Sequence, residues 1–210
     1  MGLFNKKKKH SEAESYGWDS ITAEFERIYP GQKDPKHYGT IISWDLGGND
    51  PLRGISIYDD KDCLHFVSYG LSELYEKKSE NPDVSGYGME LTFRLKKDCY
   101  KNEENEIKCI CGILQSIARI TFTKGEIFMP YEYIYTGQKT GIDSERKSAI
   151  TGFITVPDVK ANSIETKNGK VDFTELVGVK DVELQPLLKK EMTAKDLYES
   201  LKTDITDYSR

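Results

Sequence analysis

A chain of 210 residues is long enough to bury the core of one large domain or of two small ones. Aromatic residues make up 11% of it, including 13 tyrosines, which argues against an intrinsically disordered protein. The net charge of −5 disfavours a general nucleic-acid binder, because contacts to phosphates need a basic surface. No apolar run approaches the roughly 20 residues that span a bilayer, so we expect a cytoplasmic protein with no membrane contact.

Residues 1–16 are predicted to form a flexible charged tail, because the basic cluster Lys6–Lys9 is followed by no apolar stretch and so makes no secretory signal. A helix is expected next, capped by Asp19 or Ser20 and stopped by Pro30. Its apolar face consists of Ile21, Phe25 and Ile28.

Short apolar segments separated by turn residues then predict an antiparallel meander. The expected strands are 39–44, 54–59, 63–68 and 88–97, with a loop at 45–53 and a turn at 60–62. The main helix is predicted at 106–123, where a wide apolar stripe is followed by Gly125 as the C-cap residue. The stripe consists of Ile107, Ile110, Leu114, Ile117 and Thr121. Such a face implies a helix that lies across the sheet.

An aromatic loop follows, which contains Phe128, Tyr131, Tyr133 and Tyr135. We interpret it as partly buried rather than as a base-stacking surface, because it lacks basic neighbours. The remaining elements are a strand at 150–156, a hairpin of 163–166 and 170–179, and helices at 181–190 and 193–202. The pattern predicts one α+β domain, residues 17–210, with a mixed, largely antiparallel sheet flanked by helices.

Catalytic and metal-binding patterns are not visible. The three histidines, His10, His37 and His65, have no partners at a defined spacing. Cys109 and Cys111 are too close for a zinc knuckle, and we interpret them, with Cys63 and Cys99, as reduced thiols rather than metal ligands or a disulfide. We therefore expect no enzyme, no cofactor and no metal.

Two blocks carry the most specific pattern. Val67–Tyr75 (VSYGLSELY) ends a strand in an apolar turn, and Ser85–Leu95 (SGYGMELTFRL) opens with two glycines around Tyr87 and then alternates. The pair resembles the Suppressor of fused family. Further matches occur in order at 17–19, 24–31, 35–39, 46–52, 114–119 and 169–179. The resemblance implies a protein-binding module with a Suppressor-of-fused-like fold, not an enzyme.

The resemblance also implies two kinds of partner. Animal members have two domains that sequester Gli-type transcription factors by holding a short peptide as an added strand, and this chain resembles the N-terminal one. Single-domain relatives occur in bacteria, where the family is associated with immunity proteins, and a composition rich in Lys, Ile, Asn and Glu fits that source. We expect a monomeric or weakly dimeric immunity or antitoxin-like protein that binds a cognate toxin. The alternative is a regulatory or scaffold protein that sequesters an endogenous protein.

The loop between the two blocks is long, polar and acidic. On spacing alone it is a solvated loop beside a half-buried strand; the alternative is a protein-binding edge. The resemblance implies that the matching region belongs to the family's peptide-binding face. We predict a partner-binding surface made of Tyr75, Glu80, Asp83 and Tyr87. The tyrosines would act as amphipathic anchors, and the carboxylates would steer a basic partner.

Overall fold

The computed structural model describes residues 14–210, so most of the predicted tail lies outside the described residues. Within that range a mixed eight-stranded sheet has the order β1-β2-β3-β4-β8-β6-β5, and β7 pairs with the first residues of β8. The strands are β1 (Lys36–Gly39), β2 (Gly54–Asp59), β3 (Cys63–Tyr69), β4 (Val84–Lys96), β5 (Tyr133–Tyr135), β6 (Ile150–Pro157), β7 (Ile164–Thr166) and β8 (Gly169–Lys180). Every pairing is antiparallel except that of β4 with β8. The predicted α+β fold with a largely antiparallel mixed sheet is confirmed.

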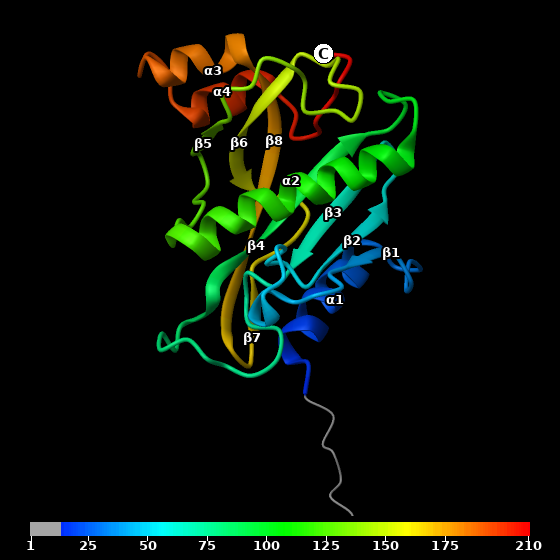
Figure 1. Cartoon of the computed structure of the whole chain (residues 1–210), viewed down its shortest axis with the longest axis vertical. Helices are drawn as coiled ribbons and strands as arrows, with labels where there is room; N and C mark the ends of the chain where they lie inside the picture. Colours follow the sequence, from blue (N-terminus) through cyan, green and yellow to red (C-terminus); the bar gives the residue numbers. More distant parts are fainter. Residues whose placement is uncertain (1–13) are drawn as a thin grey trace, which may run out of the picture.

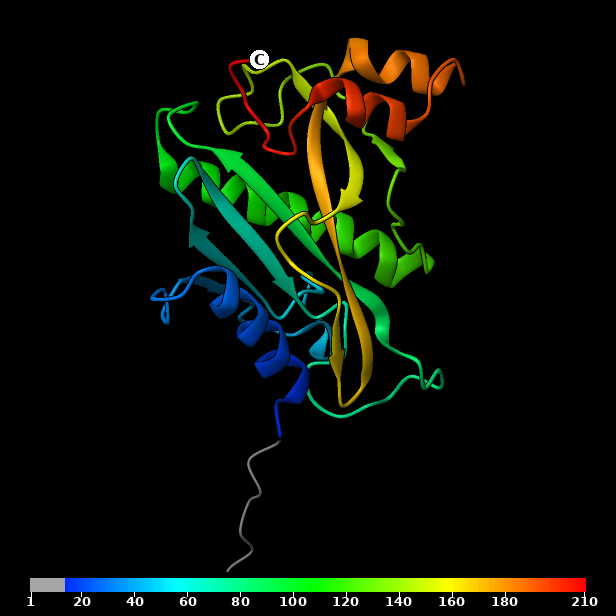
Figure 2. The same ribbon diagram turned by 180° about the vertical axis from the view of Figure 1, so that it is seen from behind.

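Four helices accompany the sheet in the described part of the chain. They are α1 (Tyr16–Ile28), α2 (Glu103–Lys124), α3 (Asp181–Leu188) and α4 (Ala194–Leu201). Figure 1 shows α2 lying across one face of the sheet, and Figure 2 shows α1 on the opposite face. Helices α3 and α4 pack together at the end of the sheet where β6 and β8 run side by side. Each of these helices is too short or too polar to span a bilayer.

Helix α2 is the element that the sequence predicts best. All five residues of the predicted stripe are buried, and the four apolar ones belong to the same core cluster as Phe66 and Phe93 of the central strands. The helix begins three residues earlier than expected because the Asn102 side chain accepts a hydrogen bond from the Asn105 amide at 3.0 Å. Gly125 ends it with φ = 74°, the left-handed conformation expected of a C-cap glycine.

The predicted start of α1 is wrong. The helix begins at Tyr16, before Asp19 and Ser20, and no side chain caps it. The reason is tertiary: the amides of Gly17 and Trp18 donate to the Leu74 carbonyl at 3.1 and 3.3 Å, so the first turn needs no capping side chain. The N-terminus of α1 is thereby docked on the first sequence block.

The predicted strand 39–44 is also wrong. Strand β1 lies at Lys36–Gly39, and Trp44–Leu46 forms a short 3₁₀ turn. The ladder ends at Thr40, whose amide still donates to the Arg53 carbonyl at 3.0 Å and whose hydroxyl donates to the Leu52 carbonyl at 2.6 Å. The later expectations hold: β7 and β8 form the predicted hairpin, and the Thr193 and Asp196 side chains form the predicted capping box of α4.

The aromatic loop was expected to be partly buried, and this holds. Phe128 packs against the core, whereas Tyr131, Tyr133 and Tyr135 are 39%, 42% and 42% exposed. The segment is not a loop throughout, however, because residues 133–135 form β5, the last strand of the sheet.

Candidate functional site

A buried carboxylate fixes the turn that ends the first sequence block. Glu90 on β4 accepts hydrogen bonds from the hydroxyls of Ser68 and Ser72 at 2.5 and 2.6 Å. It also accepts from the amides of Gly70 and Ser72 at 2.9 Å each. Burial raises the pKa of Glu90 above its ordinary value despite these four donors. The alternation of the second block therefore places the Glu90 carboxylate against the turn of the first block, and its hydrogen bonds hold that turn in place.

A second carboxylate, that of Glu73, also connects the two sequence blocks. Glu73 accepts hydrogen bonds from the amides of Lys78, Ser79 and Gly86, the last two at 2.5 and 3.1 Å, and pairs with the Lys77 ammonium at 3.4 Å. Burial acts to raise its pKa, but the hydrogen bonds from these amides outweigh burial and hold the pKa below the ordinary value. Gly86 has φ = 58°, and a Cβ there would lie 2.7 Å from the Leu71 carbonyl oxygen, so a side chain does not fit.

Between the blocks and the end of α2 lies a hollow of about 660 Å³, which we call the Tyr75 pocket. Its apolar walls are Trp44, Leu71, Leu74, Tyr75, Tyr87 and Phe122, and its charged rim is Asp45, Arg53, Glu73, Glu76 and Lys78. The Phe122 ring lies 5.3 Å from the Tyr87 ring and 5.8 Å from the Trp44 ring, measured between centroids. The Tyr75 side chain is 42% exposed although it is part of this aromatic wall.

The structure brings two of the four predicted partner-binding residues together. Tyr75 and Tyr87 line the same pocket from opposite ends of the intervening loop. Glu80 and Asp83 lie on that loop, are exposed, and are not part of the pocket wall. The Asp83 carbonyl accepts from the Lys170 amide at 2.9 Å, so the outer loop is attached to β8. The two tyrosines thus share one hollow, and the two exposed carboxylates lie outside its wall.

We expect a Glu73→Gln variant to loosen this pocket. The Gln side chain keeps one acceptor oxygen, which can serve the Lys78 and Ser79 amides as Oε1 does. The NH2 group that replaces Oε2 cannot accept from the Gly86 amide or pair with the Lys77 ammonium, so stability should fall by about 1–3 kcal/mol. Because the pKa of Glu73 is lowered in the folded state, its contribution is present above the ordinary carboxyl pKa and is lost as pH falls through the lowered value. Hydrogen exchange at the Gly86 amide at pH 7 should accelerate in Glu73→Gln but not in Glu76→Gln, an exposed control in the same loop. Unchanged exchange in both variants would contradict the role given to Glu73.

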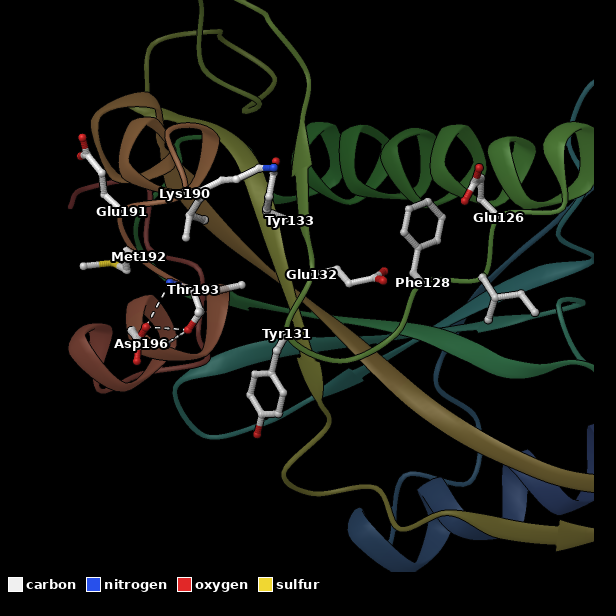
Figure 3. Close-up of a pocket in the computed structure, with 13 residues that line it drawn as sticks. Glu126, Phe128, Tyr131, Glu132, Tyr133, Lys190, Glu191, Met192, Thr193 and Asp196 are labelled. Atoms are coloured by element: carbon white, nitrogen blue, oxygen red, sulfur yellow. Dashed lines mark hydrogen bonds between the residues drawn. The ribbon is translucent and has the colours of Figure 1, made fainter.

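A second surface emerges at β5. This strand ends the sheet order and pairs with β6, so its outer edge carries no strand within residues 14–210. Beside it lies a hollow of about 770 Å³, the β5 edge pocket. Figure 3 shows Lys190, Glu191 and Met192 on one side of it and Phe128 on the other, with Tyr133 between them. An open strand edge beside a hollow is the arrangement to which an extended peptide adds.

The backbone before β5 is held in place by one buried threonine. The Thr155 hydroxyl of β6 donates to the Met129 carbonyl at 2.6 Å and accepts from the Glu132 amide at 2.9 Å. Tyr131 adopts φ = 68°, a left-handed conformation that the rest of the loop maintains. The sequence interpretation missed this surface because it took residues 133–135 for part of a loop. The spacing of Tyr133 and Tyr135, which places both on one face of a strand, was the available signal.

A buried histidine–aspartate pair resembles the arrangement of a catalytic base and its orienting carboxylate. His65 Nε2 lies 2.8 Å from the Asp158 carboxylate, and His65 Nδ1 lies 2.8 Å from the Tyr29 hydroxyl. Asp158 also accepts from the Thr92 hydroxyl at 2.7 Å. The His65 and Asp158 side chains are both 0% exposed, so a substrate does not reach them and the group supports the fold. The predicted reduced thiols are present: Cys63, Cys99, Cys109 and Cys111 are all free.

Comparison with known proteins found matches to one family. The model of the family described as Suppressor of fused protein (SUFU) matches residues 48–210. The chain is 29% identical over 181 residues to Suppressor of fused homolog from Homo sapiens and from Mus musculus, which covers 80% of this chain and 36% of each relative. The chain thus spans little more than a third of the length of these relatives.

Two solved structures share the fold. The crystal structure of the Sufu–Fu complex superposes with a TM-score of 0.81 and 26% identity, covering 93% of this chain and 91% of that chain. The crystal structure of Drosophila Suppressor of Fused gives the same TM-score and identity, covering 95% of this chain and 51% of that chain.

Proposed function

Because the chain belongs to the Suppressor of fused family, we propose that it is a non-enzymatic protein-binding module that neutralises a protein toxin by direct binding, as a bacterial immunity protein does. One of the similar structures is a complex of Sufu with Fu, which supports protein binding by this fold. The observation that carries the proposal is the Tyr75 pocket, a preformed hollow with aromatic walls.

The Tyr75 pocket is suited to an apolar anchor from a partner. Tyr75 and Tyr87 offer large contact areas at a small cost in side-chain entropy, as tyrosines do at protein interfaces. The Glu73 and Glu90 hydrogen-bond networks fix the backbone on both sides of the pocket, so a partner does not have to order it on binding. We therefore place the partner's main contact between Tyr75 and Tyr87.

The loop around the pocket favours a basic partner. Between Glu73 and Asp83 the chain carries four carboxylates and two lysines, and Lys77 is already held by Glu73 and by the carbonyls of Val84 and Asn168. Glu80 and Asp83 are exposed and lie outside the pocket, so they act at a distance rather than by close contact. Carboxylates in this position increase the association rate of a basic partner at low salt.

We expect Tyr75→Ala to weaken binding of the partner by about 2 kcal/mol or more, because it removes a central aromatic anchor. Asp83→Lys should slow association and change its salt dependence while leaving the dissociation rate nearly unchanged. Surface plasmon resonance at two salt concentrations measures both effects. Both side chains are exposed, so the melting temperature of each variant should match the parent. Parental binding by a folded Tyr75/Asp83 double variant would show that the partner does not use this surface.

The alternative function, sequestration of an endogenous protein by peptide binding, is favoured by the open edge of β5. A peptide added to β5 would lie beside the β5 edge pocket and contact Tyr133, which is 42% exposed. Tyr133→Ala is therefore a matched control for Tyr75→Ala, since both remove an equally exposed tyrosine. Loss of binding in Tyr75→Ala alone supports the Tyr75 pocket, and loss in Tyr133→Ala alone supports peptide addition at β5.

A further inference from the structure

The loop between β1 and β2 exposes three large aliphatic side chains. Ile41 is 99% exposed, Leu46 is 80% exposed and Ile42 is 58% exposed. A soluble protein exposes scattered apolar residues, but three within six positions on one loop form a patch, and such patches mark contact surfaces. Neither the Tyr75 pocket nor the β5 edge pocket includes any of the three.

This loop is held firmly by α2. The Gln115 side chain donates to the Leu52 carbonyl at 3.2 Å and accepts from the Leu52 amide at 3.0 Å. Arg119 donates to the Asn49 carbonyl at 3.0 Å and pairs with Asp50 at 3.1 Å. The aliphatic side chains therefore face solvent from an ordered backbone, which lowers the entropy lost when a partner covers them.

A hollow of about 680 Å³ lies on the same face. Its apolar lining comes from Tyr38, Ile42 and Ile55 and from Cys111 of α2, and its polar lining includes Asp50, Gln115 and Arg119. Ile41 belongs to the same lining and projects into solvent. A protruding aliphatic residue next to a hollow that is apolar in part is self-complementary, which is what a two-fold symmetric contact between identical chains requires.

The charges on this face also favour a second copy of the chain as the partner. Asp50 and Arg119, which line the hollow, pair at 3.1 Å, and nearby Lys36 pairs with Glu103 at 2.7 Å and Glu104 with Lys108 at 3.3 Å. The chain as a whole carries −5, so two copies repel each other on average. A face whose charges are paired avoids this repulsion, and it offers no excess positive charge to an anionic membrane and no excess of either sign to a charged protein.

We propose that this face is the contact surface between two copies of the chain, with the Ile41 side chain of each copy entering the hollow beside α2 of the other. The contact is small, so it produces a weak dimer that forms at high concentration. Because the aliphatic residues of this face lie outside both candidate partner sites, dimerisation does not depend on the proposed function.

Sedimentation velocity of the purified chain, from about 1 μM to about 1 mM, tests the proposal. The wild type should shift from monomer to dimer over this range, and Ile41→Asp should weaken the dimer at least about tenfold, because the new carboxylate would be buried against the apolar part of the hollow, Tyr38, Ile42 and Ile55. Val182→Asp is the matched control: it adds the same charge at an aliphatic side chain on α3 that is 72% exposed, and its dimerisation should equal that of the wild type.

Both variants should melt at the parental temperature, since neither side chain is buried. A wild type that stays monomeric throughout would overturn the proposal. So would an Ile41→Asp variant that dimerises as the wild type does, because the contact would then lie elsewhere. Equal weakening by Val182→Asp would also overturn it, because the effect would then come from net charge alone.

Discussion

Replacing Leu114 with Asp is expected to unfold the protein. Leu114 is 0% exposed and lies in the centre of the stripe that α2 packs on the sheet, so the variant loses a buried side chain and buries a carboxylate without a partner. The combined cost exceeds about 4–5 kcal/mol, which is comparable to the whole stability of an ordinary domain. Ile117→Asp, at 5% exposure, should behave in the same way.

Circular dichroism during thermal unfolding measures this effect. Ser116→Asp on the exposed side of α2 is the control, and it should retain a cooperative transition close to that of the parent. If Leu114→Asp melted at the parental temperature, the placement of α2 on the sheet would be wrong.

Removal of the Asp158 carboxylate is the second large effect. Asp158 accepts hydrogen bonds from His65 at 2.8 Å, from the Thr92 hydroxyl at 2.7 Å, and from the Lys160 and Ala161 amides at 2.8 and 2.9 Å. Asp158→Ala leaves all four of these groups without their acceptor, and each buried unsatisfied group costs about 1–3 kcal/mol. We expect a loss of at least about 3 kcal/mol in urea denaturation, against a small change for the exposed control Asp62→Ala.

The pH dependence of this effect has a defined sign. Burial acts to raise the pKa of Asp158, but the hydrogen bond and charge of His65 and the bonds from Ala161 and Thr92 outweigh burial and lower it. A carboxyl whose folded pKa is lowered stabilises the protein above its unfolded pKa of about 4, and this contribution is lost as pH falls through the lowered value. The stability difference between wild type and Asp158→Ala should therefore be largest near neutral pH and shrink below about pH 4. A difference that grows with acidification would contradict the ionised state of Asp158.

Local patterns were sufficient to predict much of the fold. The stripe from Ile107 to Thr121 is a property of one segment, and so is the hairpin signal around Asn168, because helix periodicity and turn chemistry act between near neighbours. Where prediction failed, a contact distant in sequence was responsible. The start of α1 depends on the Leu74 carbonyl, which lies 57 residues from Gly17 by their numbering, and no capping residue marks it.

The candidate sites were predictable to a smaller extent. The two sequence blocks pointed to Tyr75 and Tyr87, but Phe122, which completes the aromatic wall, comes from the end of α2. His65 and Asp158 are separated by 93 residues, so nothing near His65 in sequence reveals its partner. The edge position of β5 follows from the strand order, which includes one parallel pairing between β4 and β8 that local signals do not specify.

The central claim is that the chain binds a protein partner through the Tyr75 pocket. Quantitative capture from a lysate of the source organism, with wild type, the Tyr75→Ala/Asp83→Lys double variant and Tyr133→Ala immobilised in parallel, tests it most directly. We expect the wild type and Tyr133→Ala to capture one protein equally, and the folded double variant to lose it. Equal capture of that protein by wild type and the double variant would contradict the account.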